Sequence, residues 1–485
     1  MFSSEAWLAN PSSGFYNGVA TQSLRFDKAS SSYLIKQNST ATDAQKWTLS
    51  VWLKRTTLGA EQGILGSSST AEYVRFEADD TIRYRLYTSS AQQISMITNA
   101  KFRDTTNFFH FVCAVDLSNT TDNDKVIMYV NNTRQTLGTN TTTTTDTFDS
   151  LMNDNSTYWN LGRYSNYFGG YMSDVHIIDG QQLTPTSFAE TKEGIWIPKA
   201  YTGSYGNNGA RLEFKQTGDG SSSASASTIG ADTSGNNNHF LDANLDTYDS
   251  NMPDCPENNF CTLKGSIDHQ TSGTASEGNL KLTNAGSNGW SVATCTFAVS
   301  SGKWWYEACA SGSIGIGYNI GYQNVDTYFG ASTDGKAEGS FFYYPNTSGT
   351  AYYYVGTSDS GTVDNDIDYD VGDDFVVGDV VGIALDLDSS PPTVQHYVNG
   401  VAQGSAKQIP SGNTLTPYLG LYSASTVTTF NFGADPAFGG ITVDGSSADA
   451  TDSNGKGKFY DTPPTGFLAL CSANLPEPTI SPNAD

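Results

Sequence analysis

Apolar and polar residues alternate with a period of two along most of the chain. In EYVRFEADDTIRYRLY (72–87), Val74 and Phe76 alternate with Arg75 and Glu77 until two aspartates interrupt the pattern. A second alternating run, IRYRLY, follows these aspartates. Each run has one apolar and one polar face, which predicts an antiparallel hairpin with one buried and one solvated side.

Parity constrains the register of this hairpin. Apolar residues oppose apolar residues only when the numbers of the paired residues have an even sum. A sum of 160 places Phe76 opposite Tyr84 and leaves Asp79–Asp80–Thr81 as a three-residue turn. A five-residue turn is the alternative, whereas an odd sum would pair Glu77 with Ile82.

Further segments with this alternation are separated by short turns, which is typical of a β-sandwich. The first series comprises KWTLSVWLKR (46–55), FFHFVCAVDL (108–117), DKVIMYV (124–130), YWNLGRY (158–164) and GYMSDVHIIDG (170–180). A second series begins near residue 278 and includes KWWYEACA (303–310), VVGIALDLD (380–388) and VTTFNFG (427–433). The segment LTPTSFAET (183–191) predicts one helical turn, with Thr184 as N-cap and Pro185 at the first helical position.

The two series divide the chain into four parts. Residues 1–200 and 276–440 carry the strands, and residues 441–485 form a C-terminal tail that we expect to be irregular. Residues 201–275 are rich in Ser, Gly and Asn and are expected to form a connector with little regular structure. Because such a long structureless loop is unusual inside one domain, a boundary is expected here. The sequence predicts an all-β fold of two antiparallel β-sandwiches joined by an irregular linker.

Two strand pairs, residues 111–132 and 380–400, share one plan of apolar strand, acidic loop, apolar strand and tight turn. Asn131–Asn132 and Asn399–Gly400 predict hairpin turns, because these residues tolerate the positive φ that such turns require. The two halves are therefore interpreted as two versions of one sandwich architecture.

The net charge of the chain limits the classes of partner that it can bind. The net charge is −25, from 25 basic and 50 acidic residues. Nucleic acid and anionic membranes repel such a chain. No apolar run approaches the ~18 residues of a membrane span, and the N-terminus lacks the features of a cleavable signal. We expect synthesis in a cytoplasm, no nucleic-acid binding and no membrane insertion.

Six cysteines do not form a disulfide scaffold in a chain of this length. Cys113 and Cys471 lie in apolar strands and are expected in the core. Cys255 and Cys261 could close a small loop or hold a metal, although neither has a second close cysteine pair or a nearby histidine.

Several segments carry resemblances to known families. Residues 1–200 resemble a laminin-G-like, concanavalin A-like sandwich through SLRFDKASSSYLIK, KWTLSVWLKR and GYMSDVHIIDGQQLTPTSF. Residues 300–440 resemble a SPRY domain, also concanavalin A-like, through KWWYEACA, GDVVGIALDLD, VQHYVNG and FNFGADPAF. The whole chain resembles large virion proteins of marine tailed phages through GIWIPKAYTGSYGNNGARLEF, ADTSGNNNHF and PPTGFLALCSANLP. These resemblances imply two concanavalin A-like sandwiches in a virion protein.

The sequence does not present a catalytic constellation. The hydrolase branch of the concanavalin A-like fold uses two carboxylates on one face of a strand, as Glu-x-Asp-x-(x)-Glu. The nearest pair here, Glu72 and Glu77, has opposite strand parity and faces two different sides. His110 and His396 lie in apolar strands, where a hydrogen-bonded structural role is expected, and His176 is expected on the face opposite its apolar neighbours. We therefore expect no enzymatic activity.

The acidic insert TVDNDIDYDVGDDF (362–375) is a candidate metal site. Its aspartates recur at every second position, at Asp364, Asp366, Asp368 and Asp370. A solvated edge strand whose charges block pairing with another sheet is one interpretation. Calcium binding is the other, although Tyr369 occupies the position where a calcium loop usually has Gly. We expect no cofactor, with calcium as the alternative.

The densest aromatic stretch is SFFYYPNTSGTAYYYVG (340–356), which predicts a second hairpin. Strand alternation places its aromatic side chains on both faces. An exposed aromatic group of this size usually marks an interaction site. The alternative is that the acidic insert or another subunit covers the outer face. The candidate ligand-binding residues are Tyr343, Tyr344, Tyr352, Tyr353 and Tyr354.

The leading hypothesis is a non-enzymatic structural protein of a phage virion, in a tail fibre or another exterior appendage. It would attach to the host by binding a surface glycan or receptor, because aromatic faces stack on sugars. A purely architectural head-decoration or tail protein and a polysaccharide depolymerase are the alternatives. The expected partners are other virion proteins and the host glycan or receptor, and the phage resemblance implies a homo-oligomer, a trimer, on the exterior of the virion.

Overall fold

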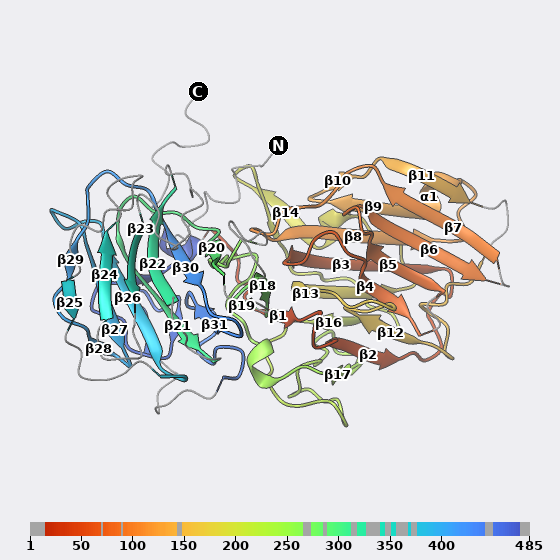
Figure 1. Ribbon diagram of the computed structural model, residues 1–485. Helices are drawn as coiled ribbons and strands as arrows, with labels where there is room; N and C mark the ends of the chain where they lie inside the picture. The colour runs from red at the N-terminus through yellow and green to blue at the C-terminus, as the bar shows by residue number, and fades with distance from the viewer. Residues whose placement is uncertain are drawn as a thin grey trace. The chain divides into compact units, whose positions relative to one another are not determined.

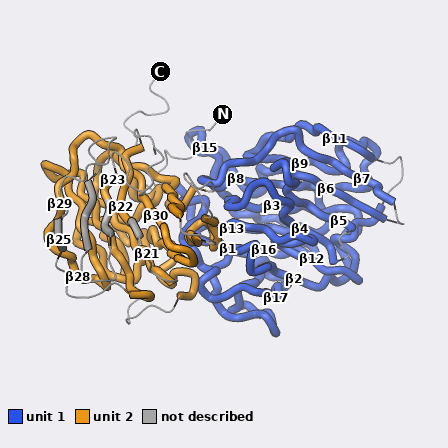
Figure 2. The backbone as a smooth tube through the Cα atoms, viewed as in Figure 1, with its two compact units in different colours: residues 1–259, 476–485 blue, residues 260–475 orange. Residues whose placement is uncertain are grey.

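The structure is a computed structural model in which antiparallel β-strands dominate, as the alternation predicts (Figure 1). It describes residues 15–68, 71–88, 91–142, 148–264, 273–284, 289–311, 318–325, 340–344, 351–355, 367–369, 376–441 and 450–475. The chain divides into two compact units between Asn259 and Phe260 (Figure 2).

Unit 1 contains two antiparallel sheets, here called sheet A and sheet B. In the described residues, sheet A has the order β1 (Ser23–Phe26), β13 (Gly170–Asp179), β3 (Lys46–Arg55), β8 (Phe109–Asp116), β9 (Val126–Val130) and β10 (Thr133–Arg134), and β16 (Ala210–Leu212) also pairs with β13. Sheet B has the order β11 (Leu137–Thr142), β7 (Ala91–Thr98), β6 (Ile82–Thr88), β5 (Glu72–Phe76), β4 (Gln62–Ser67), β12 (Tyr158–Leu161), β2 (Tyr33–Gln37) and β17 (Leu241–Ala243).

The helical elements of unit 1 are short. Among the described residues they are α1 (Asp122–Lys125), η3 (Pro185–Ser187) and η4 (Thr247–Asp249). The predicted helical turn is confirmed as η3, with Thr184 as N-cap and Pro185 in its first turn. It leads into a two-stranded ribbon, β14 (Ala189–Lys192) and β15 (Ile195–Pro198).

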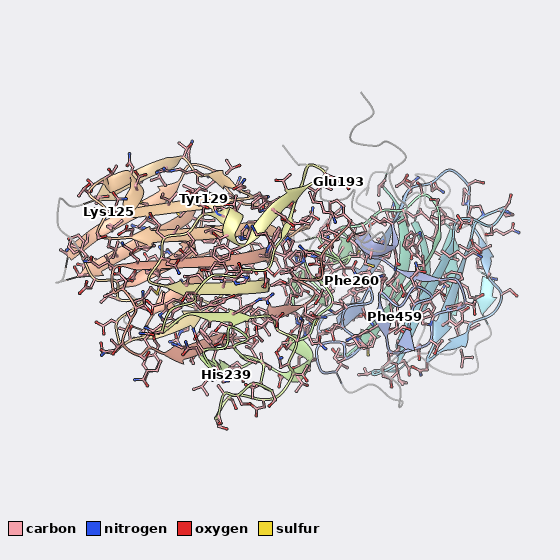
Figure 3. All side chains as sticks on the ribbon, turned by 180° about the vertical axis from the view of Figure 1, so that it is seen from behind. Lys125, Tyr129, Glu193, His239, Phe260 and Phe459 are labelled. Atoms are coloured by element: carbon pink, nitrogen blue, oxygen red, sulfur yellow. The ribbon has the colours of Figure 1, made fainter. Side chains whose placement is uncertain are left out.

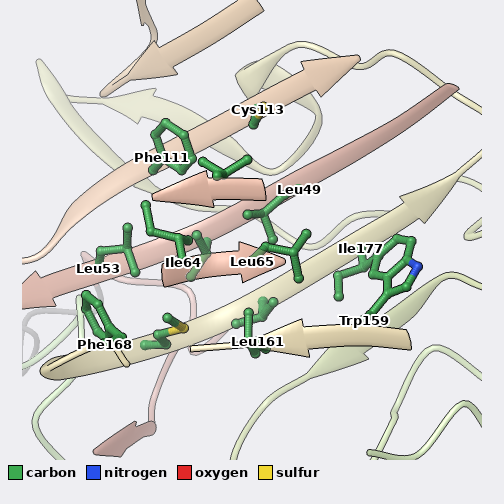
Figure 4. Close-up of a cluster of buried hydrophobic side chains, with 14 of the residues drawn as sticks. Leu49, Leu53, Ile64, Leu65, Phe111, Cys113, Trp159, Leu161, Phe168 and Ile177 are labelled. Carbon is green, nitrogen blue, oxygen red and sulfur yellow. The ribbon is translucent and has the colours of Figure 1, made fainter. Parts of the chain in front are cut away.

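The core of unit 1 lies between the two sheets, because every second side chain of each sheet points inward. Leu49 and Phe111 come from sheet A, and Ile64 and Trp159 come from sheet B, and all four are fully buried (Figure 4). Cys113 belongs to the same cluster, so its expected place in the core is confirmed. Burying these side chains supplies most of the free energy that holds a sandwich together.

The first predicted hairpin is β5–β6. Val74 pairs with Tyr84 and Phe76 with Ile82, so the pair sum is even, as parity requires. The specific sum of 160 is wrong, and the five-residue alternative is correct, with residues 77–81 as the turn. The turn chemistry explains the difference: Asp80 has a φ of +70° and its carboxylate lies 3.2 Å from Arg55 Nη2.

Two further turn predictions are confirmed. Asn131 and Asn132 have φ values of +45° and +64°, and Asn399 and Gly400 have +48° and +75°. In each case two residues separate the paired strands, because Val130 pairs with Thr133 and Val398 with Val401. These are the left-handed conformations that a two-residue hairpin turn requires.

Residues 201–259, expected as part of the connector, belong to unit 1. β16 and β17 add strands to both of its sheets. Lys54 Nζ, on a fully buried side chain, lies 2.9 Å from Asp254 Oδ2, and Arg25 Nη2 lies 2.9 Å from Asp249 Oδ1. Composition alone does not reveal this packing, because the anchoring residues are single carboxylates in a polar segment.

Unit 2 also contains two large sheets in its described residues, antiparallel apart from one short pairing. One has the order β18 (Gly273–Ser276), β19 (Lys281–Asn284), β31 (Val427–Asn431), β21 (Lys303–Ala310), β26 (Val380–Asp386), β27 (Thr393–Val398) and β28 (Val401–Ala402), with β29 (Lys407–Gln408) on β27. The other has the order β20 (Ser291–Thr294), β30 (Leu415–Leu421), β22 (Tyr318–Asn324), β23 (Ser340–Tyr344), β24 (Ala351–Val355) and β25 (Ile367–Tyr369). Tyr306 and Tyr322 connect the sheets, with ring centroids 5.4 Å apart.

The described part of the C-terminal tail, residues 450–475, packs into unit 2. β34 (Leu468–Ala469) pairs in parallel with β21, and β32 (Ala450–Thr451) pairs with β33 (Lys458–Phe459). Phe459, labelled in Figure 3, has a fully buried side chain, and so does Cys471. The chain then makes the short turn η5 (Ser472–Asn474). The sequence predicts an irregular tail, whereas the described part of this segment contains these short strands and is an integral part of unit 2.

Candidate functional site

The outer face of sheet A is covered by the chain itself. Val112 and Ile178 point outward from this sheet and form a buried cluster with Phe188 from the segment after β13. Trp52 and His110 are also buried on this face, and Trp196 of β15 contacts the His110 ring. This face therefore offers little surface to a ligand.

The outer face of sheet B is different, because polar and aromatic side chains, most of them half-buried, gather on it. We call one group the Tyr73 cluster, and it consists of Tyr73, Arg75, Arg83, Arg85, Tyr87 and Tyr164. Strand alternation places its first five members on one face, since Val74, Tyr84 and Leu86 point into the core. Tyr164 arrives from the loop after β12.

Tyr73 is the buried base of the cluster. Its ring centroid lies 4.3 Å from that of Tyr164. The guanidinium carbon of Arg75 lies 5.0 Å from the Tyr73 centroid, and that of Arg85 lies 4.9 Å from the Tyr87 centroid. Such cation–π contacts hold planar groups in stacked order and leave half-buried rings and guanidinium edges at the surface.

Two glutamates neutralise two of the arginines. Arg75 Nε and Nη2 lie 2.8 and 3.0 Å from the two carboxylate oxygens of Glu77, and Arg75 Nη1 lies 2.6 Å from Glu61 Oε2. Arg83 Nη1 lies 3.6 Å from Glu77 Oε1. Arg85 does not contact a carboxylate among the described residues, so the cluster has an excess of positive charge in a strongly acidic chain.

Two glycines of β4 let the loop that carries Tyr164 lie directly on the sheet. A Cβ at Gly66 would stand 2.8 Å from the carbonyl oxygen of Arg163, and one at Gly63 would overlap the backbone nitrogen of Tyr164. Asn166 Nδ2 donates to Glu61 Oε2 at 3.1 Å and ties the loop to the cluster. The backbone thus fixes where Tyr164 stands above Tyr73.

Glu72 lies on the core side of β5, as its parity predicts. Its carboxylate accepts hydrogen bonds from Tyr84 Oη at 2.8 Å, from Ser150 Oγ and from the Met152 backbone nitrogen. Burial raises the pKa of this carboxyl group. Because the side chain is fully enclosed between the sheets, it cannot meet a polysaccharide and has a structural role.

Ser50 and His110 form a serine–histidine pair, 2.8 Å between Oγ and Nε2. Trp196 Nε1 donates to His110 Nδ1 at 3.1 Å, so the neutral ring carries its proton on Nε2. A general base would need a free lone pair at Nε2 facing the hydroxyl group. Burial lowers the pKa of His110 to about 3, and the pair is structural, as expected for this histidine.

His176 lies opposite its apolar neighbours, as predicted. Its Nε2 is 3.0 Å from Asp174 Oδ2, and Arg211 Nε donates to Asp174 Oδ1 at 3.0 Å. Burial alone would raise the pKa of Asp174, but His176 and Arg211 together hold it below its usual value. His396 is also fully buried, and burial lowers its pKa to about 3.

The aromatic stretch of unit 2 forms the predicted hairpin. β23 pairs with β24 so that Tyr343 lies opposite Tyr353, Tyr344 opposite Tyr352 and Phe342 opposite Tyr354. The side chains of these tyrosines lie outside the part of the chain that the structure describes. Their role as a ligand platform therefore stays a prediction.

Part of the acidic insert forms a strand. Asp368 lies in β25, which pairs with β24 and is the last strand of its sheet among the described residues. Asp364, Asp366 and Asp370 lie outside the described residues, so calcium binding there stays a prediction. Where the structure describes side chains, it does not place three or more His, Cys, Asp or Glu residues together to hold a metal ion.

Cys255 and Cys261 are both buried free thiols. The backbones of Cys255 and Asn258 exchange two hydrogen bonds of 3.1 Å, and the Cys261 nitrogen donates to Leu470 O at 2.9 Å. Burial raises the pKa of the Cys255 thiol. Each cysteine is held by backbone pairing in a different unit, and the interpretation as a disulfide-closed loop is not supported.

Comparison with known proteins agrees with the fold. Residues 27–187 match a laminin G family model described as the concanavalin A-like lectin/glucanases superfamily. The chain thus carries a concanavalin A-like domain within unit 1, as the resemblance of its sequence implies. A comparison with curated proteins gives no match. Within the described ranges, no helix has the length and apolar character that crossing a bilayer requires.

Solved structures of similar fold include SPRY domains. That of human HERC1 is 17% identical, covers 32% of this chain and 88% of its own, and has a TM-score of 0.24. A SAP-like pentraxin from Limulus polyphemus is 10% identical over 35% of this chain and 80% of its own, with a TM-score of 0.24. A candidate carbohydrate-binding protein from Bacteroides ovatus is 13% identical over 46% of this chain and 58% of its own, with a TM-score of 0.33.

Sequence reasoning did not identify the Tyr73 cluster as a site, although a signal was present. All nine arginines of the chain lie between residues 25 and 211, and three of them fall in the run VRFEADDTIRYR. Arginine on the solvated face of a strand is easily interpreted as ordinary surface charge. Tyr164 comes from a loop 79 positions beyond Arg85, so only the folded chain brings it to the cluster.

Proposed function

We propose that this chain is a non-enzymatic glycan-binding protein and that the Tyr73 cluster is its binding surface. The observation that supports the proposal most directly is the gathering of tyrosines and arginines on the outer face of sheet B, where four of the six cluster residues are half-buried. Aromatic faces stack on the C–H surfaces of sugar rings, and guanidinium and amide groups donate hydrogen bonds to their oxygens. The concanavalin A-like domain that carries the cluster is consistent with such a role.

We further propose that the protein stands on the exterior of a phage virion, in a tail fibre or another appendage, and attaches the particle to its host. The support for this part is the resemblance of GIWIPKAYTGSYGNNGARLEF, ADTSGNNNHF and PPTGFLALCSANLP to phage virion proteins. Other virion proteins and a host-surface glycan would be its partners, and a homotrimer would be its assembly. The function requires no cofactor.

Adsorption of the purified protein to host cells tests the proposal. Replacing Tyr87 with Ala removes a half-buried ring at the edge of the cluster and is expected to weaken adsorption about tenfold. Tyr129→Ala, on β9 of sheet A (Figure 3), is the matched control and should adsorb as the unaltered protein does. Both variants must retain the melting temperature of a folded chain.

The outcomes separate the alternatives. If neither the unaltered protein nor the variants adsorb to cells, the protein is an architectural component and the proposal is wrong. If incubation with host polysaccharide releases reducing ends, the protein is a depolymerase. If the Tyr87→Ala variant adsorbs as well as the unaltered protein does, the binding surface lies outside the Tyr73 cluster.

A further inference from the structure

The arginines of this chain fall into two classes. Seven of the nine contact a carboxylate, with N–O distances of 2.6 to 3.6 Å. The two exceptions among the described residues are Arg85 and Arg163, and both lie on the outer face of sheet B. The chain has twice as many acidic as basic residues, so carboxylate partners are abundant elsewhere.

Arg85 is held in place by aromatic rings instead of by a counter-charge. Its guanidinium carbon lies 4.9 Å from the Tyr87 centroid and 5.8 Å from the Tyr73 centroid. Its Nη1 makes a long contact of 3.4 Å to Tyr73 Oη, and its buried Nε does not meet an acceptor among the described residues. The guanidinium group is therefore held in one orientation, positively charged, and has few hydrogen-bond acceptors among the described residues.

Arg163 repeats this arrangement at the other end of the same face. Its guanidinium carbon lies 4.5 Å from the Tyr33 centroid and 5.8 Å from the Tyr167 centroid. The two tyrosine rings are 6.0 Å apart, and all three side chains are half-buried. A planar cation between rings offers a stacking surface. Its N–H groups can also form a bidentate hydrogen bond with a carboxylate or a sulfate.

We propose that this face selects an anionic glycan, one that carries carboxylate or sulfate groups, with Arg85 and Arg163 as the residues that recognise the acidic groups. This inference rests on the proposed glycan-binding function and adds the chemical class of the ligand. Arg75 and Arg83 do not take part directly, because Glu61 and Glu77 already neutralise them. Tyr87 and Tyr167 supply the neighbouring rings on which sugar units stack.

The acidic character of the whole chain sets a condition on this recognition. A net charge of −25 repels a polyanion at long range. At physiological ionic strength the screening length is about 8 Å, so the ligand responds chiefly to the two guanidinium groups that lack a carboxylate partner among the described residues. Attraction at this range is local, and it weakens when salt is raised further.

The test compares the binding of three oligosaccharides of equal length: an oligogalacturonate, a sulfated galactan and a neutral galactan. Calorimetry in about 0.15 M salt measures the affinity of the whole protein and of the variants Arg85→Gln, Arg163→Gln, Arg85→Lys and Arg134→Gln. Arg134 is the matched control, because it is an exposed arginine of sheet A paired with Asp124. Thermal unfolding confirms that each variant is folded.

At least one anionic ligand is expected to have a dissociation constant at least about tenfold lower than that of the neutral ligand. One charge-assisted hydrogen bond accounts for a difference of this size. Arg85→Gln and Arg163→Gln should each lose that margin, Arg85→Lys should keep part of it, and Arg134→Gln should keep all of it. The uronate and sulfate ligands identify which acidic group is preferred.

Equal affinity for the neutral and anionic ligands, or Gln variants that keep the preference, would overturn this inference and leave glycan binding itself intact. Absence of binding to all three ligands, together with absence of adsorption to host cells, would instead contradict the proposed function.

Discussion

At the scale of single residues, two buried glutamates show why a carboxylate in this type of sandwich need not be catalytic. Glu72 is enclosed in unit 1, and Glu307 of β21 is enclosed in unit 2. Glu307 accepts hydrogen bonds from Asn431 Nδ2 at 3.1 Å and from the backbone nitrogens of Tyr460 and Asp461. Burial outweighs these donors and raises the pKa of Glu307 to about 8. Such a group acts on stability and not on a substrate.

Glu307 should make stability depend on pH in a definite direction. Between the unfolded pKa of about 4.5 and the folded value of about 8, the folded chain holds a proton that the unfolded chain has released. The free energy of unfolding therefore falls as pH rises through this window, by up to about 1.4 kcal/mol per pH unit. Urea denaturation between pH 7.5 and pH 8.5 reports chiefly on this group, because His110 and His396 are neutral in the folded chain and, with an ordinary pKa of about 6.5, almost neutral in the unfolded chain.

The variant Glu307→Gln removes the titrating group and should flatten this slope. Its free energy of unfolding at pH 6.5 should be lower by about 1–3 kcal/mol. The NH2 group of the glutamine replaces a carboxyl oxygen, so it faces N–H donors that then lack an acceptor. A slope that the variant retains would assign the pH dependence to another group.

At the scale of elements, the strands could be predicted and the turns only in part. KWTLSVWLKR and KWWYEACA correspond residue for residue to β3 and β21, because alternation reports directly which side chains a sheet buries. Parity predicts an even pair sum for the β5–β6 hairpin. The length of its turn depends on Asp80, whose partners Arg55 and Arg103 lie far from it in the sequence. Long-range ion pairs of this kind leave no local pattern.

The candidate site was less accessible to sequence reasoning for the same reason. The alternation in RYRLY places Arg83, Arg85 and Tyr87 on a solvated face. It does not show that Tyr164 will stand on Tyr73, since that contact depends on two glycines in β4. The aromatic stretch at residues 340–356 is evident in the sequence, because its aromatic residues stand in two consecutive runs.

Gly66→Ala tests the element that positions Tyr164. The new Cβ would stand 2.8 Å from Arg163 O and 2.9 Å from Tyr164 Cα, so the loop must lift from the sheet. The free energy of unfolding should fall by about 1–3 kcal/mol, and glycan binding should weaken with it. Gly138→Ala in β11 is the control, because its Cβ would meet only ordinary contacts at 3.6 Å and should change stability by less than about 0.5 kcal/mol.

At the scale of the whole molecule, the chain is divided where packing ends and not where composition changes. Residues 201–259 look like a linker in sequence, yet their carboxylates Asp249 and Asp254 neutralise Arg25 and Lys54 on fully buried positions of sheet A. A buried cation without its partner is strongly unfavourable. Unit 1 is therefore complete only when the chain reaches Asn259.

Truncation tests this division. A fragment of residues 1–259 should fold and give a cooperative thermal transition, whereas a fragment of residues 1–200 should not. In the whole chain, Asp254→Asn should destabilise unit 1 by about 3–5 kcal/mol, because it removes the carboxylate that lies 2.9 Å from the buried ammonium group of Lys54. If the fragment of residues 1–200 folds cooperatively, residues 201–259 are not required for the fold of the sandwich.

The central claim is that a glycan binds the outer face of sheet B, and hydrogen exchange of the whole protein with and without an anionic oligosaccharide tests it most directly. Backbone amides of residues 82–88 in β6, and of the loop at residues 162–168, are expected to exchange more slowly when the ligand is bound. Protection confined to residues 340–355 of unit 2, with no change in sheet B, would contradict the claim and place the binding surface on the aromatic hairpin.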